Sequence, residues 1–85
     1  MKNNSQYYKT DSFYFSAFLL AEGFSLDCVE KSPINSNKLI FVFPHSKDLQ
    51  KLKTLYFSYQ ATVKPQDYSN AMSALRSIIY EQKSR

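Results

Sequence analysis

Hydrophobic residues dominate the segment from Thr10 to Phe24, TDSFYFSAFLLAEGF, on almost every side of a predicted helix. The polar interruptions of this apolar run are Ser12, Ser16 and Glu22. Thr10 or Asp11 can cap the first turn, and Gly23 suits the left-handed position that follows many helices. A helix that is apolar all round has to be covered on more than one side, by neighbouring elements or by a second copy of the chain.

Three extended segments are predicted around this helix. Residues 6–9, QYYK, have high strand propensity and lead directly into it. Residues 25–31 alternate imperfectly, as an edge or half-buried strand does. After a turn-forming cluster at residues 32–37, the run Leu39–Phe43 is apolar throughout and ends at Pro44. This pattern predicts a hairpin whose second strand is central and covered on both faces.

The second half of the chain predicts two more helices separated by a short extended segment. Ser46 can cap an amphipathic surface helix, and Phe57 points away from the apolar stripe of that helix. Residues 61–64 are expected to be extended, because the position before a proline is pushed out of the helical region. Pro65 then opens a third helix with a narrow packing stripe. The stripe consists of Tyr68, Ala71, Met72, Leu75, Ile78, Ile79 and Gln82.

The order strand, helix, strand, strand, helix, strand, helix matches the α+β ferredoxin-like split βαβ plan, β-α-β-β-α-β, with an extra C-terminal helix. In that plan the strands at residues 6–9 and 39–43 are central. If the first or the fourth strand is a loop, the alternative is a β-hairpin packed by three helices. One globular domain is expected over residues 6–82, with a flexible tail at 1–5 and a frayed end at 83–85.

Composition indicates a small intracellular domain with a real core. Hydrophobic residues make up 44% of the 85 positions, and the chain contains seven tyrosines and seven phenylalanines. One cysteine allows no internal disulfide, which favours a reducing compartment. The apolar stretch at 13–21 is too short to span a bilayer, and the first residues do not resemble a signal peptide. A cytoplasmic protein with no membrane partner is expected.

Catalytic chemistry has little support in the sequence. His45 is the one histidine, and an ordinary turn residue is the interpretation we favour for it. Cys28 and His45 could form a nucleophile and base only if they lay within hydrogen-bond reach, with Cys28 exposed. Two such residues cannot make a zinc site alone, and a single glycine leaves no phosphate-cradling loop. We therefore expect no enzyme, no catalytic residues, no metal and no cofactor.

Positive charge and aromatic residues favour nucleic acid as a partner. Eleven Lys and Arg against seven Asp and Glu leave a formal charge of +4. Aromatics next to lysines on the two proposed central strands resemble RNA-recognition modules, whose middle strands stack bases. The glycines of that family's third-strand motif are missing from NKLIFVFPH. The alternative is that Phe41 and Phe43 are core residues and that the helix lysines are only solvated.

Single-stranded nucleic acid is a more favoured partner than duplex. The predicted binding residues are Tyr7, Tyr8, Lys9, Lys38, Lys47 and Lys51. The rival hypothesis is a protein-interaction subunit of a larger complex, which docks through an exposed aromatic patch.

A homo-oligomer is also expected from the hydrophobic pattern. The first helix and the central strand are apolar on more faces than a chain of 85 residues is expected to cover. A two-fold dimer would supply the missing surface. The predicted interface residues are Phe15, Phe18 and Leu19.

Nearly the whole chain resembles a small family of uncharacterised bacterial and phage-borne proteins known only as a domain of unknown function. The similar parts are YYKTDSFYFSAFLLAEGF, the hairpin ending in LIFVF, and the closing NAMSALRSIIY. The resemblance implies a fold carried on small accessory genes, including those of phages or mobile elements. It implies no established activity and no site residues.

Overall fold

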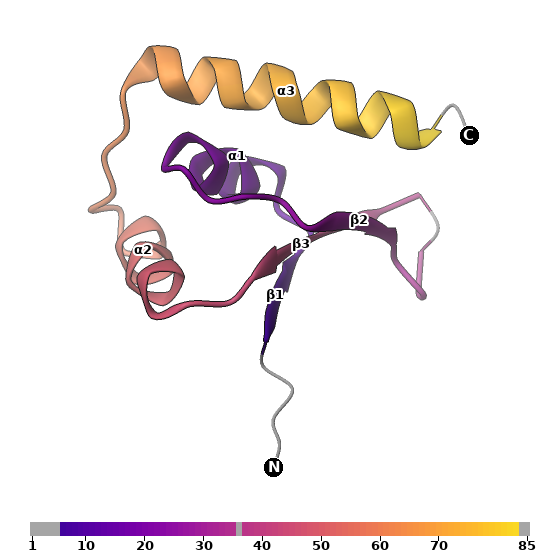
Figure 1. The fold of residues 1–85 in the computed structure, drawn as a ribbon, viewed down its shortest axis with the longest axis horizontal. Helices are drawn as coiled ribbons and strands as arrows, with labels where there is room; N and C mark the ends of the chain where they lie inside the picture. The colour runs from indigo at the N-terminus through magenta and orange to yellow at the C-terminus, as the bar shows by residue number, and fades with distance from the viewer. Residues whose placement is uncertain (1–5, 36, 84–85) are drawn as a thin grey trace.

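A computed structural model describes residues 6–35 and 37–83, which form a small α+β protein (Figure 1). A three-stranded antiparallel sheet in the order β1-β3-β2 is combined with three helices among these residues. The elements in chain order are β1 (Tyr7–Thr10), α1 (Phe13–Ala21), β2 (Cys28–Lys31), β3 (Leu39–Pro44), α2 (Lys47–Phe57) and α3 (Pro65–Lys83). The predicted tail at 1–5 and residues 84–85 of the predicted frayed end lie outside the described residues, and α3 stays helical to Lys83.

The predicted fourth strand is wrong, and with it the complete ferredoxin-like plan. Residues 61–64 have no strand partner and form the connection between α2 and α3. Ala61 and Val63 are instead half-buried against the core from this connection. The element order is therefore β-α-β-β-α-α, with β3 central as predicted and β1 at the edge instead of the centre. The alternative of a two-stranded hairpin is also wrong, because β1 pairs with β3.

Local sequence signals explain where α1 begins and ends. The cap is Ser12, whose Oγ accepts a hydrogen bond from the Phe15 amide at 3.1 Å, rather than Thr10 or Asp11. Gly23 has a φ of 98°, and the Phe24 amide donates back to the Leu19 carbonyl at 3.0 Å. The predicted glycine stop is therefore confirmed.

The helix α1 is the centre of the core. It lies beneath α3 and also packs against α2, while Phe41 and Phe43 of the sheet join the same buried cluster (Figure 1). Fully buried Ser16 is accommodated because its hydroxyl donates to the Ser12 carbonyl at 2.7 Å. The buried hydrophobic cluster comprises Phe15, Ala17, Phe18, Leu19, Phe41, Phe43, Leu49, Ala71 and Leu75.

Burial of α1 inside one chain corrects the predicted oligomer interface. Phe15 and Leu19 have 0% of their surface exposed and Phe18 has 2%. Phe15 contacts the rings of Tyr8, Tyr56 and Phe57, which come from β1 and α2. The three predicted interface residues are thus covered by the protein's own elements and are not available to a second copy.

Candidate functional site

Strand β1 turns its two tyrosines to opposite faces of the sheet. The Tyr8 ring packs edge-on against Phe15, with centroids 5.8 Å apart, and Lys53 Nζ lies 5.1 Å from the Tyr8 centroid. Burial raises the pKa of the Tyr8 hydroxyl above its ordinary value. Tyr7 points away from the helices and is 49% exposed. Of the two predicted stacking residues, only Tyr7 offers an accessible ring.

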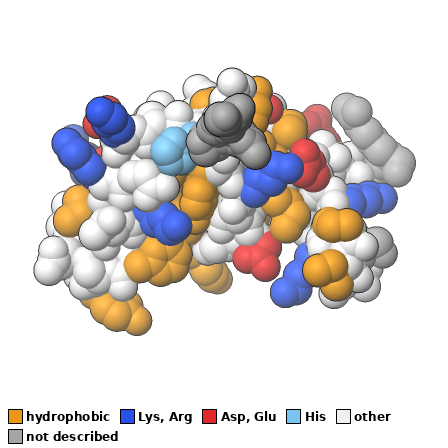
Figure 2. All heavy atoms as spheres, turned by 90° about the horizontal axis from the view of Figure 1, so that it is seen from below, with side chains coloured by type: hydrophobic (Ala, Val, Ile, Leu, Met, Phe, Trp, Pro, Cys, Tyr) orange, Lys and Arg blue, Asp and Glu red, His pale blue; other side chains and the backbone are white. Residues whose placement is uncertain are grey.

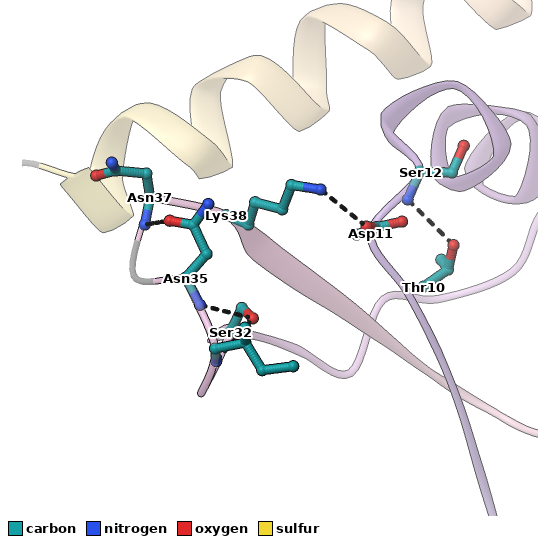
Figure 3. A network of polar contacts seen from close by, with 8 residues as sticks. Thr10, Asp11, Ser12, Ser32, Asn35, Asn37 and Lys38 are labelled. Carbon is teal, nitrogen blue, oxygen red and sulfur yellow. Dashed lines mark hydrogen bonds and ion pairs between the residues drawn. The ribbon is translucent and has the colours of Figure 1, made fainter.

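The predicted lysines of the sheet region are engaged by acidic side chains. Lys9 Nζ lies 3.3 Å from Glu30 Oε1 across the sheet. Lys38 Nζ reaches toward Asp11 Oδ2 at 3.8 Å, beside the loop that Ser32 and Asn35 organise (Figure 3). Exposed pairs of this kind stabilise a protein by about 1 kcal/mol or less, but the nearby carboxylates offset the positive charge that Lys9 and Lys38 would present to a polyanion.

The central strand does not present a base-stacking platform. Phe41 and Phe43 are buried in the hydrophobic cluster beneath the helices, as the core interpretation predicted. The residue between them, Val42, faces the other side of the sheet, where it lies opposite Lys9 and Cys28. Seen from the side opposite α3, lysine and acidic side chains are interspersed with hydrophobic ones rather than gathered in one basic field (Figure 2).

A stronger combination of charge and aromatic surface lies on α2. Ser46 Oγ accepts from the Leu49 amide at 3.1 Å and caps the helix, which buries Leu49. Lys47 and Lys51 stand one turn apart on the exposed side of this helix. Neither makes an ion pair with another residue of the described chain. Both predicted helix lysines are therefore accessible.

Two exposed rings follow at the C-terminal end of α2. Phe57 is 57% exposed and Tyr59 is 97% exposed. Between them and Ala61 is an open cavity of about 510 Å³, whose wall is completed by Tyr56. Tyr56 itself packs inward, 4.9 Å from the Phe15 centroid. We call Phe57, Tyr59 and this cavity the α2 aromatic end.

Sequence analysis missed the α2 aromatic end as a site. The available signal was Phe57, which departs from the apolar stripe of its helix. Tyr59 gave no such signal, because its exposure follows from a left-handed backbone with a φ of 63°. The Gln60 amide donates to the Leu55 carbonyl at 2.9 Å and closes the helix around this residue.

The structure does not bring Cys28 and His45 together. Cys28 lies opposite Val42 in the sheet. Val42 precedes His45 by three residues, and three residues of extended chain span about 10 Å, which separates the two side chains. His45 Nε2 instead lies 3.0 Å from Gln50 Nε2. Desolvation, with the carboxylates of Asp27 and Glu30, raises the pKa of the exposed Cys28 thiol, which disfavours the thiolate.

Metal and membrane features are likewise missing from the part of the chain that is described. No group of three His, Cys, Asp or Glu residues in it is placed to hold a metal ion. No helix in it is both long enough and apolar enough to cross a bilayer.

Comparison with known families confirms the resemblance seen in the sequence. Residues 5–81 match the model of a domain of unknown function, DUF5659. The chain belongs to this family. The match spans β1 through most of α3, so the DUF5659 domain includes all six elements. No curated protein and no solved structure matches the chain.

Proposed function

We propose that this DUF5659 protein is a small non-enzymatic module that binds single-stranded nucleic acid through α2 and its aromatic end. The observation that carries the proposal is the accessible pair Lys47 and Lys51, which leads along one helix to the exposed rings of Phe57 and Tyr59. This binding surface differs from the one predicted from the sequence. It keeps Lys47 and Lys51, and it gives the predicted residues of the sheet region a lesser role.

The two halves of this surface suit the two parts of a nucleotide strand. Ammonium groups one helical turn apart can follow a phosphate backbone and release its counterions. Exposed aromatic rings can stack on bases of any sequence, each stacked base contributing about 1–3 kcal/mol. The open cavity of about 510 Å³ at the aromatic end leaves room for an unpaired base.

Fluorescence anisotropy of labelled single-stranded DNA, single-stranded RNA and duplex DNA, at low and near-physiological salt, tests the proposal. We expect tighter binding to a single strand, which weakens as salt rises. The double variant Lys47→Gln/Lys51→Gln should reduce the salt slope by about 1.4, two phosphate contacts at about 0.7 each. Tyr59→Ser, which removes a ring that is 97% exposed, should weaken binding while leaving that slope unchanged.

The matched control is Lys9→Gln/Lys38→Gln, which removes the same charge from residues that are already ion-paired. The affinity of this control for single-stranded nucleic acid should fall less than that of Lys47→Gln/Lys51→Gln. Equal losses for the two variants would mean that only net charge matters, and no binding to any probe at low salt would reject the function.

A second candidate is a protein-docking subunit, favoured by the contiguous exposure of Leu55, Phe57 and Tyr59. Apolar contacts at such a patch are not weakened by salt as phosphate contacts are. A protein partner that binds equally well at low and near-physiological salt, and whose binding is lost with Tyr59→Ser but not with the lysine variant, would support this candidate over nucleic acid.

A further inference from the structure

The outer edge of β1 is open because residues 61–64 do not form the fourth strand. In the sheet, β1 pairs with β3 on one side and has no strand on the other among the described residues. An uncovered strand edge presents backbone donors and acceptors that can pair with another chain.

The hydrogen-bond register identifies which groups face this edge. The His45 amide donates to the Gln6 carbonyl at 2.8 Å, so Gln6 and His45 are a hydrogen-bonded pair of the antiparallel ladder. Alternation then directs the backbone groups of Tyr8 toward β3 and those of Tyr7 and Lys9 away from it. The Val42 carbonyl, opposite Lys9, accordingly accepts from Asp27 on the β2 side.

This edge is complementary to a second copy of itself. In an antiparallel arrangement with a two-fold axis at Tyr8, Tyr7 of each copy lies opposite Lys9 of the other, which gives two equivalent pairs. Each pair consists of residues whose N–H and C=O groups already point outward, so four backbone hydrogen bonds form without any change of register. The exposed Tyr7 ring would then lie beside the Lys9 side chain of the second copy, on the face of the sheet where Lys9 pairs with Glu30.

We propose that the β1 edge pairs with β1 of a second copy to form a continuous six-stranded antiparallel sheet. The homodimer surface is therefore residues 7–9, in place of the buried α1 residues that the hydrophobic pattern indicated. Each chain carries a formal charge of +4, and Lys53 lies over Tyr8 near the two-fold axis. Association consequently strengthens as salt screens this repulsion, the opposite of the salt dependence expected for nucleic-acid binding.

Amide hydrogen exchange of the unmodified protein, measured by NMR over a range of protein concentrations, tests the pairing directly. The Tyr8 amide should be protected at every concentration, because it bonds to β3. The Tyr7 and Lys9 amides should exchange rapidly in dilute protein and become protected as concentration rises, in parallel with the dimer fraction from analytical ultracentrifugation.

The variant Lys9→Pro removes an outward N–H at a position where an edge strand tolerates proline, together with the ammonium that pairs with Glu30. It should weaken self-association about tenfold or more, since two hydrogen bonds are lost per dimer. Lys9→Gln is the control that removes the charge but keeps the N–H, and it should associate at least as well as the parent chain.

A monomer at all concentrations up to about 1 mM would overturn the proposal. So would a dimer in which the Tyr7 and Lys9 amides stay unprotected, whatever surface that dimer uses. Neither result depends on nucleic acid, so this inference and the proposed function can fail separately.

Discussion

Tyr59 combines an unfavourable backbone with a side chain that is 97% exposed. A non-glycine residue in the left-handed region is destabilised by about 1–2 kcal/mol, and an exposed ring offers little packing to offset this. We therefore expect Tyr59→Gly to raise the free energy of unfolding by about 1 kcal/mol in urea denaturation. The same variant should weaken nucleic-acid binding, because the ring is lost.

The comparison variant Tyr59→Ala keeps the strained backbone but removes the ring. It should bind as poorly as Tyr59→Gly without gaining stability. A decrease in stability for Tyr59→Gly would show that the ring packs on the protein and is not free for a ligand.

Two half-buried tyrosines couple stability to alkaline pH. Burial raises the pKa values of Tyr8 and Tyr68, so the folded state favours their neutral forms. The resulting stability is fully present below the ordinary tyrosine pKa of about 10 and is lost as pH rises through the raised folded-state values. Urea midpoints should therefore fall above about pH 10.

Tyr8→Phe should reduce this alkaline loss. Both hydroxyls have a hydrogen-bond partner, the Thr10 side chain for Tyr8 and the Tyr14 carbonyl, at 3.2 Å, for Tyr68. An alkaline profile for Tyr8→Phe that is identical to that of the parent chain would exclude Tyr8 as a source of the loss.

At the scale of the element, α2 depends on its cap as much as on its packing. The helix buries Leu49 fully while most of its other residues are half-buried or exposed, so its first turn relies on the hydrogen bond from the Leu49 amide to Ser46 Oγ. Ser46→Ala should lower the free energy of unfolding by about 1 kcal/mol.

Ser58→Ala is the matched control at the other end of α2. The Ser58 hydroxyl donates to the Leu55 carbonyl at 3.2 Å in an exposed position. Its loss should change the free energy of unfolding by less than about 0.5 kcal/mol. Denaturant midpoints that fall equally for both variants would contradict a special role for the cap.

At the scale of the whole molecule, α3 completes the single core. It packs along α1, and Ala71 and Leu75 belong to the same buried cluster as the phenylalanines of α1 and β3. Since α3 is the element that packs most extensively on α1, we expect α1 not to stay buried without it (Figure 1). We therefore expect residues from β1 to α3 to unfold as one cooperative unit.

A chain ending at residue 64 should consequently show no cooperative unfolding transition by circular dichroism. A chain ending at Lys83, which removes only the last two positions, should unfold like the parent. A sharp transition in the shorter chain would mean that the sheet and the first two helices form a core of their own.

Local chemistry made part of this fold predictable from sequence. Gly23 ends α1, the apolar run from Leu39 became the central strand, and Pro65 opens α3. Residues 61–64 were predicted as a strand from the conformation that precedes a proline. That rule predicts an extended backbone but supplies no partner, and a strand exists only when another strand pairs with it.

The candidate site was less predictable than the fold. Lys9 and Lys38 looked identical to Lys47 and Lys51 in the sequence, but their acidic partners come from residues 21 and 27 positions away along the chain. Tyr8 and Tyr7 were treated alike, although alternation along β1 turns one ring inward and leaves the other exposed. These distinctions depend on which face of a strand meets the helices.

The sequence by itself determined the glycine stop of α1, the proline start of α3, the central strand and the need to cover α1 on several sides, because glycine and proline geometry and hydrophobic periodicity act over a few residues. Only the tertiary structure decided what covers α1, which lysines stay unpaired, and that β1 has an open edge. Those outcomes depend on contacts between segments far apart in the chain, where packing and strand pairing select among arrangements that are locally equivalent. The same contacts that bury Phe15, Phe18 and Leu19 leave the α2 aromatic end and the β1 edge at the surface.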